Sequence, residues 1–413
     1  MLPVSSCRRP AGWLGLLLLF SGCARPAGPA VGSATTAIGS AAAAGPAAGS
    51  APDYLVYVGT NVAAAQEPTI FLYRLSAATG ALTRVGAYPG GTKPTYLAMP
   101  AGRRFLYAVS ETETFQGASG GGVSAFAVDP RTGALTLLNQ QPAAGSGPCY
   151  ISLDHTGKAA LVASYGSGSV GLLPVQADGR LAAPTATDQH QGHGPHPNQG
   201  GPHAHCLLPD PANRYAFAVD LGTDQVTAYR LDVARGQLAR QPEPAFTARP
   251  GAGPRHLTFA PGGQRAYLIN ELNSTVTALG YDAPAGRFQE LQTVSALPAG
   301  YAGPTNSCAD IHVAPSGRFL YASNRGHNSI AVFALDAASG RMTLVQHEPT
   351  QGQTPRNFAL TPDGRLLLVA NQNSSSIVTF RVDAQTGRLT PTGQTAADVP
   401  TPMFVQVIED FTK

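Results

Sequence analysis

The sequence predicts an all-β fold, a seven-bladed β-propeller with four-stranded blades, and two observations lead to it. One short sequence motif recurs seven times: a strand-like apolar run, a few small residues, then a glycine followed two positions later by a large apolar residue. Glycine and proline together make up 82 of the 413 residues and only 12% are charged, which is typical of a turn-rich all-β chain. The recurring glycines, which lie 53, 46, 57, 50, 54 and 47 residues apart as in propeller blades, are Gly80, Gly133, Gly179, Gly236, Gly286, Gly340 and Gly387.

Each repeat predicts the same four strands in the same order. A proline-led inner strand, such as 254–259, is followed by an apolar second strand, such as 265–271. The third strand, such as 329–335, shows a strong alternation of side-chain type. The glycine hairpin then leads to an outer strand, such as 341–345. Glycine suits that hairpin because it adopts positive φ without a Cβ clash. The recurrence therefore reflects architecture rather than function.

The C-terminal segment is expected to close the ring. Residues 402–407 form an apolar strand with no repeat of its own to join, and they can pair with 54–58 at the start of the first blade. Such closure leaves no free sheet edge.

The first 22 residues predict a lipoprotein-type signal peptide. Arg8 and Arg9 supply a positive start, and eight apolar residues follow at 13–20. Eight are too few for a membrane-spanning helix, which needs about 20, so the stretch is typical of a signal peptide. Small residues then lead to Cys23, as at a bacterial lipobox. We expect lipidation of Cys23, with a plain exported protein as the alternative.

Residues 23–52 are expected to be a lipidated cysteine and a flexible tether, and residues 53–410 the propeller. The tether is nearly all Ala, Gly, Pro and Ser and has nothing large to bury. The protein is therefore expected to be exported and lipid-anchored in the bacterial cell envelope, facing the periplasm or the cell surface. Its only contact with the membrane would be the N-terminal lipid.

Charge and cysteine content exclude some partners. The formal net charge is +3 and falls to +1 when Arg8 and Arg9 leave with the signal, so no basic field attracts nucleic acid. Cys149, Cys206 and Cys308 lie far apart and are expected to be small buried thiols, with a single bridge as the alternative. We expect a monomer that uses no cofactor.

Polar residues gather where the inner strands begin and the second strands end. In a propeller the inner strands line the central channel, whose mouth commonly binds ligands. Polar groups cost desolvation energy where packing residues are expected, so their concentration in blades four to six predicts a site, with a solvated channel rim as the alternative. The residue after the leading proline, or its equivalent, is Thr95, Cys149, His203, Arg255, Ala309, Arg356 and Met403, and the next residue is Tyr96, Tyr150, Ala204, His256, Asp310, Asn357 and Phe404. The second strands end in pairs such as Ser110-Glu111, Asn270-Glu271 and Asn324-Arg325.

Seven passages of these channel segments carry a family resemblance. They are Gly201-Pro202-His203-Ala204-His205, Asp220-Leu221-Gly222-Thr223-Asp224, Gly253-Pro254-Arg255-His256, Asn270-Glu271-Leu272, Ala309-Asp310-Ile311-His312, Ser323-Asn324-Arg325-Gly326-His327 and Pro355-Arg356-Asn357-Phe358. Together they resemble the seven-bladed lactonase family, which includes propeller-type 6-phosphogluconolactonases and the fungal carboxy-muconate cyclase. The similarity covers about residues 54–407.

The resemblance implies a catalytic set. It consists of His203 or His205, Arg255, Glu271 and Arg325. We expect the neighbouring channel positions Arg356, His256, Asp310, Asn324 and Asn270 to bind substrate. One departure is that relatives usually carry an Arg-Gln pair where this chain has Asn198-Gln199, which weakens the expectation of phosphate recognition.

These residue types suit lactone hydrolysis. The reaction needs a base to activate water, donors for the developing oxyanion and an acid for the leaving alkoxide. Glu271 is the candidate base, Arg255 and Arg325 can hold an oxyanion, carboxylate or phosphate, and a histidine can carry the proton. An Arg-Glu pair that only cross-links blades is the alternative.

The sequence therefore predicts an enzyme of carbohydrate metabolism, a carboxylic-ester hydrolase acting on a sugar lactone. The substrate is either 6-phosphogluconolactone-like or an unphosphorylated aldonolactone. The alternative function is a non-catalytic, surface-tethered propeller that binds a glycan or a peptide.

Two other chemistries are weaker. Five histidines lie within sixteen residues, and three of them could bind a transition metal, but only Asp188 accompanies them, so we expect no metal. They are His190, His193, His196, His203 and His205. The closest match to a nucleophile elbow, 166–170, falls in a predicted β-turn, which argues against a serine hydrolase.

Overall fold

A computed structural model describes residues 53–64 and 67–412. The predicted signal peptide, Cys23 and the whole tether lie outside the described residues. Within the described part of the chain, no helix is long and apolar enough to cross a membrane.

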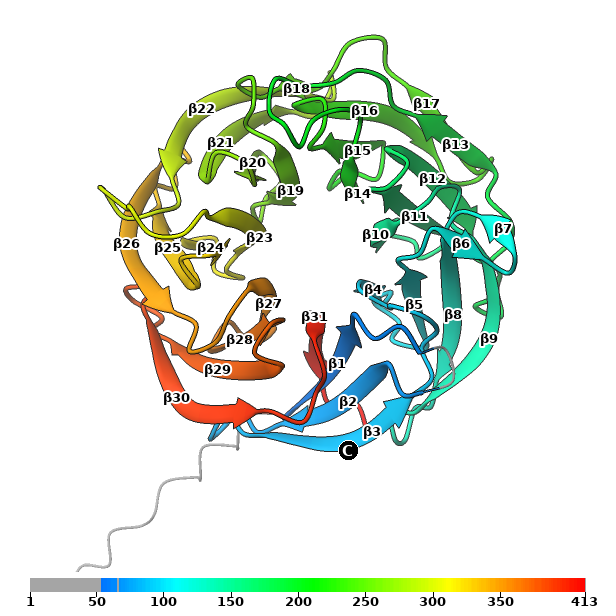
Figure 1. The fold of residues 1–413 in the computed structure, drawn as a ribbon, viewed down its shortest axis with the longest axis horizontal. Helices are drawn as coiled ribbons and strands as arrows, with labels where there is room; N and C mark the ends of the chain where they lie inside the picture. The colour runs from blue at the N-terminus through cyan, green and yellow to red at the C-terminus, as the bar shows by residue number, and fades with distance from the viewer. Residues whose placement is uncertain (1–52, 65–66, 413) are drawn as a thin grey trace, which may run out of the picture. The chain divides into compact units, whose positions relative to one another are not determined.

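The described residues form seven four-stranded antiparallel blades around a central channel, as predicted (Figure 1). From the channel outward, blades one to seven are β31-β1-β2-β3, β4-β5-β8-β9, β10-β11-β12-β13, β14-β15-β16-β17, β19-β20-β21-β22, β23-β24-β25-β26 and β27-β28-β29-β30.

The inner strands are β31 (Pro402–Glu409), β4 (Leu97–Ala98), β10 (Pro148–Leu153), β14 (Ala204–Pro209), β19 (Pro254–Phe259), β23 (Ser307–Val313) and β27 (Pro355–Leu360). The second strands are β1 (Tyr54–Thr60), β5 (Phe105–Ser110), β11 (Ala159–Ser164), β15 (Tyr215–Asp220), β20 (Arg265–Asn270), β24 (Phe319–Arg325) and β28 (Leu366–Asn371).

The third strands are β2 (Ile70–Leu75), β8 (Gly122–Val128), β12 (Ser169–Pro174), β16 (Gln225–Asp232), β21 (Thr275–Asp282), β25 (Ser329–Leu335) and β29 (Ser376–Val382). The outer strands are β3 (Leu82–Tyr88), β9 (Leu135–Pro142), β13 (Ala186–Gln189), β17 (Gln237–Arg240), β22 (Arg287–Ser295), β26 (Met342–Pro349) and β30 (Leu389–Ala396). A short strand β18 (Phe246–Thr247) also pairs with β16, and β6 (Thr114–Phe115) and β7 (Ala118–Ser119) form a separate hairpin.

The C-terminal strand closes the ring. β31 is the inner strand of blade one and pairs antiparallel with β1, from Tyr54 opposite Glu409 to Thr60 opposite Pro402. Blade one thus joins the two ends of the propeller, which confirms the predicted closure.

The hydrophobic core lies between adjacent blades. The second strands are almost wholly buried, whereas the outer strands are largely exposed or half-buried. One interface packs Phe217 of blade four against Phe288 of blade five, with ring centroids 4.6 Å apart. Blades therefore stabilise one another through apolar contacts along the whole ring.

The seven recurrent glycines connect third to fourth strands, each with positive φ between 62° and 86°. Four of their carbonyls also accept hydrogen bonds from a tyrosine of the preceding blade. The pairs are Tyr57 with Gly133 at 2.7 Å, Tyr107 with Gly179 at 3.0 Å, Tyr267 with Gly340 at 3.0 Å and Tyr321 with Gly387 at 2.9 Å. A Cβ at Gly387 would lie 2.4 Å from the Phe319 ring, so this hairpin also needs glycine for close packing between blades.

A β-bulge interrupts the start of most inner strands. In β19, Pro254 pairs with Asn270 and His256 with Ile269, so Arg255 is the extra residue. A bulge bends the strand and changes the direction of the side chain at that position. The corresponding extra residues in β10, β14, β27 and β31 are Cys149, His205, Arg356 and Met403.

The alignment of blade four from sequence was wrong by two residues. Ala204 pairs with Asp220, so the equivalents of Arg255 and His256 are His205 and Cys206 rather than His203 and Ala204. The reason is that His203 still belongs to the preceding loop, where its backbone N–H donates to Asp220 Oδ1 at 2.9 Å.

Candidate active site

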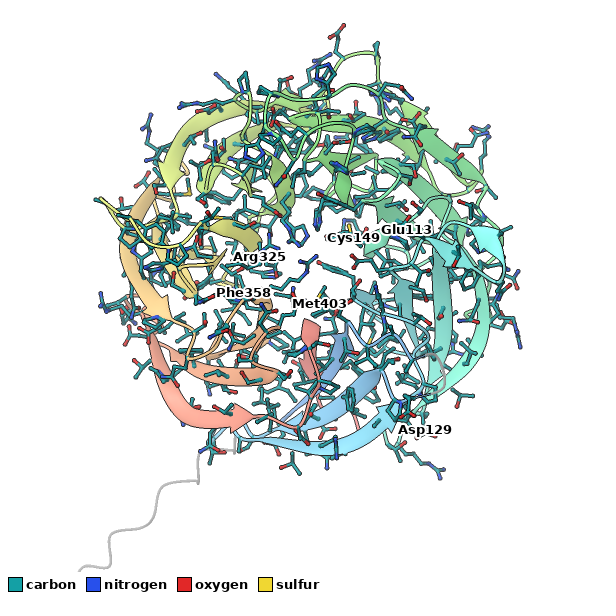
Figure 2. All side chains as sticks on the ribbon, viewed as in Figure 1. Glu113, Asp129, Cys149, Arg325, Phe358 and Met403 are labelled. Atoms are coloured by element: carbon teal, nitrogen blue, oxygen red, sulfur yellow. The ribbon has the colours of Figure 1, made fainter. Side chains whose placement is uncertain are left out.

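A small pocket opens at the channel end where inner strands begin and second strands end. Its volume is about 250 Å³, including space open to solvent. Figure 2 shows Cys149, Arg325 and Met403 around this central channel, on strands of three different blades. The pocket is lined by Thr95, Tyr96, Glu111, Cys149, Arg255, His256, Arg356, Asn357 and Met403.

At the edge of this pocket, Glu271 lies between two arginines. Its Oε2 is 3.0 Å from Nε of Arg255 and 2.7 Å from Nη2 of Arg325. Its Oε1 accepts a hydrogen bond from the Ser307 hydroxyl at 3.0 Å. The side chain of Glu271 is 17% exposed, so the ion pairs are mostly buried but still accessible to water.

The arginines keep Glu271 ionised. Burial alone would raise its pKa, but Arg325, Arg255 and Arg356, together with the Ser307 hydroxyl, hold the pKa of Glu271 below its usual value. Burial lowers the pKa of Arg325 to about 10 in spite of Glu271, which still leaves the guanidinium charged at neutral pH.

The guanidinium of Arg255 is hydrogen-bonded through Nη1 and ion-paired through Nε. Its Nη1 donates to the Ala309 carbonyl at 2.5 Å and lies 3.2 Å from Nε2 of His256. Its Nε–H faces Glu271 but has no well-aligned acceptor among the residues that the structure describes. A ligand oxygen that is better aligned than Glu271 would compete for this N–H.

Arg356 is the least satisfied cation of the pocket. It lines the cavity but makes no hydrogen bond or ion pair with the described residues. Burial and the charge of Arg255 lower its pKa, while Glu111 and Glu271 act in the opposite direction. The fold therefore keeps an unpaired guanidinium beside Arg255, an arrangement that favours an anionic or strongly polar ligand.

Two residues outside the predicted site set lie in the pocket or close to Glu271. Glu111 accepts a hydrogen bond from the Thr95 hydroxyl at 2.5 Å and lines the pocket. Tyr165 lies near enough to Glu271 for that carboxylate to contribute, after burial, to a raised pKa of its hydroxyl. Both directly follow a second strand, as Glu271 does, and this shared repeat position was the signal that could have found them.

The two candidate histidines occupy different environments. His205 is buried, with Nδ1 3.6 Å from the Cys149 sulfur, and burial together with Arg255 holds its pKa well below the usual range. His203 is half-buried and stacks on Tyr165 with ring centroids 4.3 Å apart. Its Nδ1 lies 3.0 Å from the Tyr165 carbonyl oxygen.

The buried cysteines match the prediction of free thiols. Cys149, Cys206 and Cys308 are all unpaired and buried. Burial and the nearby Glu111 raise the pKa of Cys149, so its thiol stays protonated and is a poor nucleophile.

Of the predicted substrate-binding residues, Arg356 and His256 line the pocket, whereas Asp310, Asn270 and Asn324 do not. The Asn270 amide donates to Thr275 at 2.9 Å and Thr277 at 3.1 Å within its own blade. The Asn324 amide donates to the Ala296 carbonyl at 2.9 Å. Because neighbouring residues of a strand point to opposite faces, each asparagine points into its blade while the next residue faces the channel.

Below the pocket, aromatic side chains fill the channel. Tyr96 packs against Tyr150 and Phe404, with ring centroids 4.4 and 4.1 Å away, and Tyr150 meets the His256 ring edge-on at 5.3 Å. A second and larger hollow, about 1500 Å³ including open space, lies beyond this layer and is lined by later residues of the inner strands. Among them, His155 is tied to the Asp210 carbonyl at 2.9 Å.

Asp310 is the polar centre of this floor. Its Oδ1 lies 2.8 Å from Nδ1 of His256, and its Oδ2 lies 2.8 Å from Nε2 of His312. The Asn357 amide also donates to Oδ2, at 2.5 Å, and its own oxygen accepts from the Val405 N–H at 2.8 Å. Burial opposes ionisation, but His312 and His256 hold the pKa of Asp310 far below its usual value.

The remaining histidines of the sixteen-residue cluster lie in the loop between β13 and β14. His190 is buried, with Nδ1 2.6 Å from Asp220 and Nε2 2.8 Å from the Tyr229 hydroxyl, whereas His193 is exposed. In the described part of the chain, no three His, Cys, Asp or Glu side chains are grouped so that they could hold a metal ion. Nearby, Gln199 is fully buried and donates to Asp224 at 2.8 Å, whereas Asn198 is exposed.

Known proteins share both this sequence pattern and this fold. The family described as "Lactonase, 7-bladed beta-propeller" matches residues 55–407. A 6-phosphogluconolactonase of Bacillus subtilis is 39% identical over 305 residues, which cover 74% of this chain and 84% of the relative.

Two solved structures extend the comparison. A periplasmic gluconolactonase of Pseudomonas aeruginosa superposes with a TM-score of 0.80 at 34% identity, covering 86% of this chain and 99% of that one. A putative 6-phosphogluconolactonase of Bacteroides fragilis gives a TM-score of 0.79 at 34% identity, covering 88% and 99%.

Replacing Glu271 by Gln is expected to lower the melting temperature at neutral pH. The change leaves two shielded guanidinium groups without their counter-charge, and breaking a buried ion pair costs about 3–5 kcal/mol. Because the pKa of Glu271 lies below its usual 4.5 in the folded protein, its ion pairs stabilise the fold above that pH and are lost as the carboxylate is protonated. The difference between wild type and Glu271→Gln should therefore shrink between pH 7 and pH 3, and a constant difference would contradict this account.

Proposed function

The chain belongs to the lactonase family of seven-bladed β-propellers, and we propose that it is a carboxylic-ester hydrolase that opens a sugar lactone at the Glu271 pocket. The observation that carries this proposal is the carboxylate of Glu271 between Arg255 and Arg325, next to the unpaired Arg356. The pocket thus combines a base with several cationic donors, as ester hydrolysis requires.

Glu271 is our candidate for the base that activates water. In the free protein the two arginines reduce its basicity. A lactone whose carbonyl oxygen takes over donors of Arg255 would weaken that compensation and make Glu271 a stronger base. Water then adds to the carbonyl carbon and gives a proton to Glu271. The ring C–O bond breaks, and the leaving alkoxide takes up the proton that Glu271 received, directly or through a histidine, which gives the hydroxy acid and restores the carboxylate.

His203 suits the role of proton carrier better than His205. His203 is half-buried and therefore accessible to water. His205 is buried against Cys149, and its lowered pKa keeps it neutral over the physiological range.

The substrate class follows from the charges around the pocket. Three arginines, Arg255, Arg325 and Arg356, face two carboxylates, Glu111 and Glu271, so a modest positive excess remains for a developing oxyanion or an anionic substituent. We propose an aldonolactone, with or without a phosphate. The names of the relatives include both a 6-phosphogluconolactonase and a gluconolactonase.

The proposed activity predicts a large loss of rate in Glu271→Gln. With its base removed, the variant should lose about 10²-fold or more in kcat/KM. The rate is measured with a pH indicator on phosphorylated and unphosphorylated lactones, at a temperature where the variant is folded. Glu243→Gln, at an exposed position, is the matched control and should keep the wild-type rate. The proposal fails if the wild type opens no lactone faster than buffer does.

Replacing Arg356 by Gln should separate binding from stability. Because this guanidinium has no polar partner among the described residues and lies beside Arg255, its removal should leave the melting temperature unchanged or raise it. The KM for a lactone should rise about tenfold or more, since a hydrogen bond to a charged group contributes about 1.5–3 kcal/mol. A variant with a lower melting temperature and an unchanged KM would show that Arg356 is structural.

We also propose that the protein is exported and anchored through a lipid on Cys23. The lipobox-like sequence supports this, as does the similarity to a periplasmic enzyme. A Cys23→Ala variant should move from the membrane fraction to the soluble envelope fraction and lose incorporation of labelled fatty acid. Recovery of the unaltered protein in the soluble fraction, without label, would contradict the lipid anchor.

A further inference from the structure

Two histidines lie on opposite sides of one buried carboxylate, and they face different ends of the channel. His256 lines the pocket beside Arg255, whereas His312 lines the hollow beyond the aromatic floor. Asp310 is 2.8 Å from a ring nitrogen of each. The three side chains thus form a continuous polar path through the floor.

The hydrogen bonds determine the tautomer of His256. Arginine has only donors, so Nη1 of Arg255, 3.2 Å from Nε2 of His256, needs a lone pair on that nitrogen. Asp310 accepts from Nδ1 on the other side of the ring, which places the single proton there. Burial and Arg255 lower the pKa of His256 to about 4, in agreement with a neutral ring.

The pKa of His312 is shifted in the opposite direction. Burial opposes its ionisation, but Asp310 raises the pKa of His312 above the usual value. Its side chain is 36% exposed in the far hollow, so it can exchange protons with water there. The positive charge of His312 in turn contributes to the lowered pKa of His256. One carboxylate therefore lies between two histidines whose pKa values are shifted in opposite directions.

We propose that His256 and Asp310 are positioning residues that orient Arg255 toward Glu271, and that His312, bonded to the other oxygen of Asp310, helps to keep His256 in the form that this orientation requires. The proposal rests on the proposed lactone hydrolysis at the Glu271 pocket. In this proposal, a residue in the hollow beyond the aromatic floor influences a reaction in the Glu271 pocket.

His256 is surrounded on several sides. The groups that face it are Arg255 on its own strand β19, His205 on β14 with ring centroids 5.2 Å apart, Asp310 and His312 on β23, and the rings of Tyr96 and Tyr150. Of these groups, Asp310 and His312 form a hydrogen-bonded link from His256 to the far hollow, and His312 is the ionisable group that lines that hollow, which makes His312 the position to vary.

Two substitutions of His256 distinguish a role in orienting Arg255 from a purely structural role in packing. His256→Asn keeps a donor near the position of Nδ1 and lacks an acceptor for Arg255, so kcat should fall about 10²-fold, as expected for a catalytic group misplaced by about 1 Å. His256→Gln can offer its amide oxygen near the position of Nε2 and should retain more activity. A purely structural role would lower the melting temperature of both variants and leave their kcat values alike, which would overturn the proposal.

The pH profile tests the part assigned to His312. His312→Gln removes one contribution, after burial and Arg255, to the lowered pKa of His256, so the acid limb of kcat/KM should move to higher pH. Protonation of Glu271 contributes to that limb in both proteins and cancels in the comparison. His155→Gln is the control, because His155 lines the same hollow and shares no hydrogen bond with Asp310 in the described part of the chain. Superimposable profiles for His312→Gln and wild type would contradict the proposal.

Failure of the positioning can be distinguished from failure of the function. If the wild type opens no lactone, the proposed function fails, and a crystal structure of His256→Asn still tests the positioning. A shift of the Arg255 guanidinium by about 1 Å or more away from Glu271 would support it. An unmoved guanidinium would overturn it.

Discussion

The centre of the ring depends on the buried carboxylate of Asp310. It accepts hydrogen bonds from His256 of blade five, His312 of its own blade six and Asn357 of blade seven, and Asn357 extends the contact to Val405 of blade one. An unpaired carboxylate at this depth would cost several kcal/mol, so these inner strands must keep one register relative to one another. The pocket takes its geometry from that floor, because Arg255 lies between His256 and Glu271.

The propeller scaffold and the candidate site are built from different parts of the same repeat. Four of the seven glycine hairpins at the outer edge accept a hydrogen bond from a tyrosine hydroxyl of the preceding blade and so link adjacent blades. Bulges at the start of the inner strands direct residues such as Arg255 and Arg356 into the channel. The outer edge repeats because every blade packs on a similar neighbour. The inner edge varies because its residues share one pocket, where each can take a different role.

The sequence predicted the frame almost completely, and the site only in part. Glycine spacing, strand order and the closing strand follow from local turn chemistry and periodicity, and all three are confirmed. The registers at the channel depend on loop contacts, so His203 was aligned where His205 belongs. Strand alternation could have shown that Asn270 points away from the channel when Glu271 faces it. No local pattern could show that Arg356 would be left unpaired, because this depends on four blades meeting in three dimensions.

The central claim is that the pocket at Glu271 receives the lactone. A crystal structure of Glu271→Gln soaked with a slowly hydrolysing aldonolactone tests it most directly, because this substitution keeps the shape of the pocket and removes the proposed base. The account predicts the lactone carbonyl within hydrogen-bonding distance of Arg255 and the rest of the sugar beside Arg356. A lactone bound only in the hollow below the aromatic floor, or elsewhere on the ring, would contradict it.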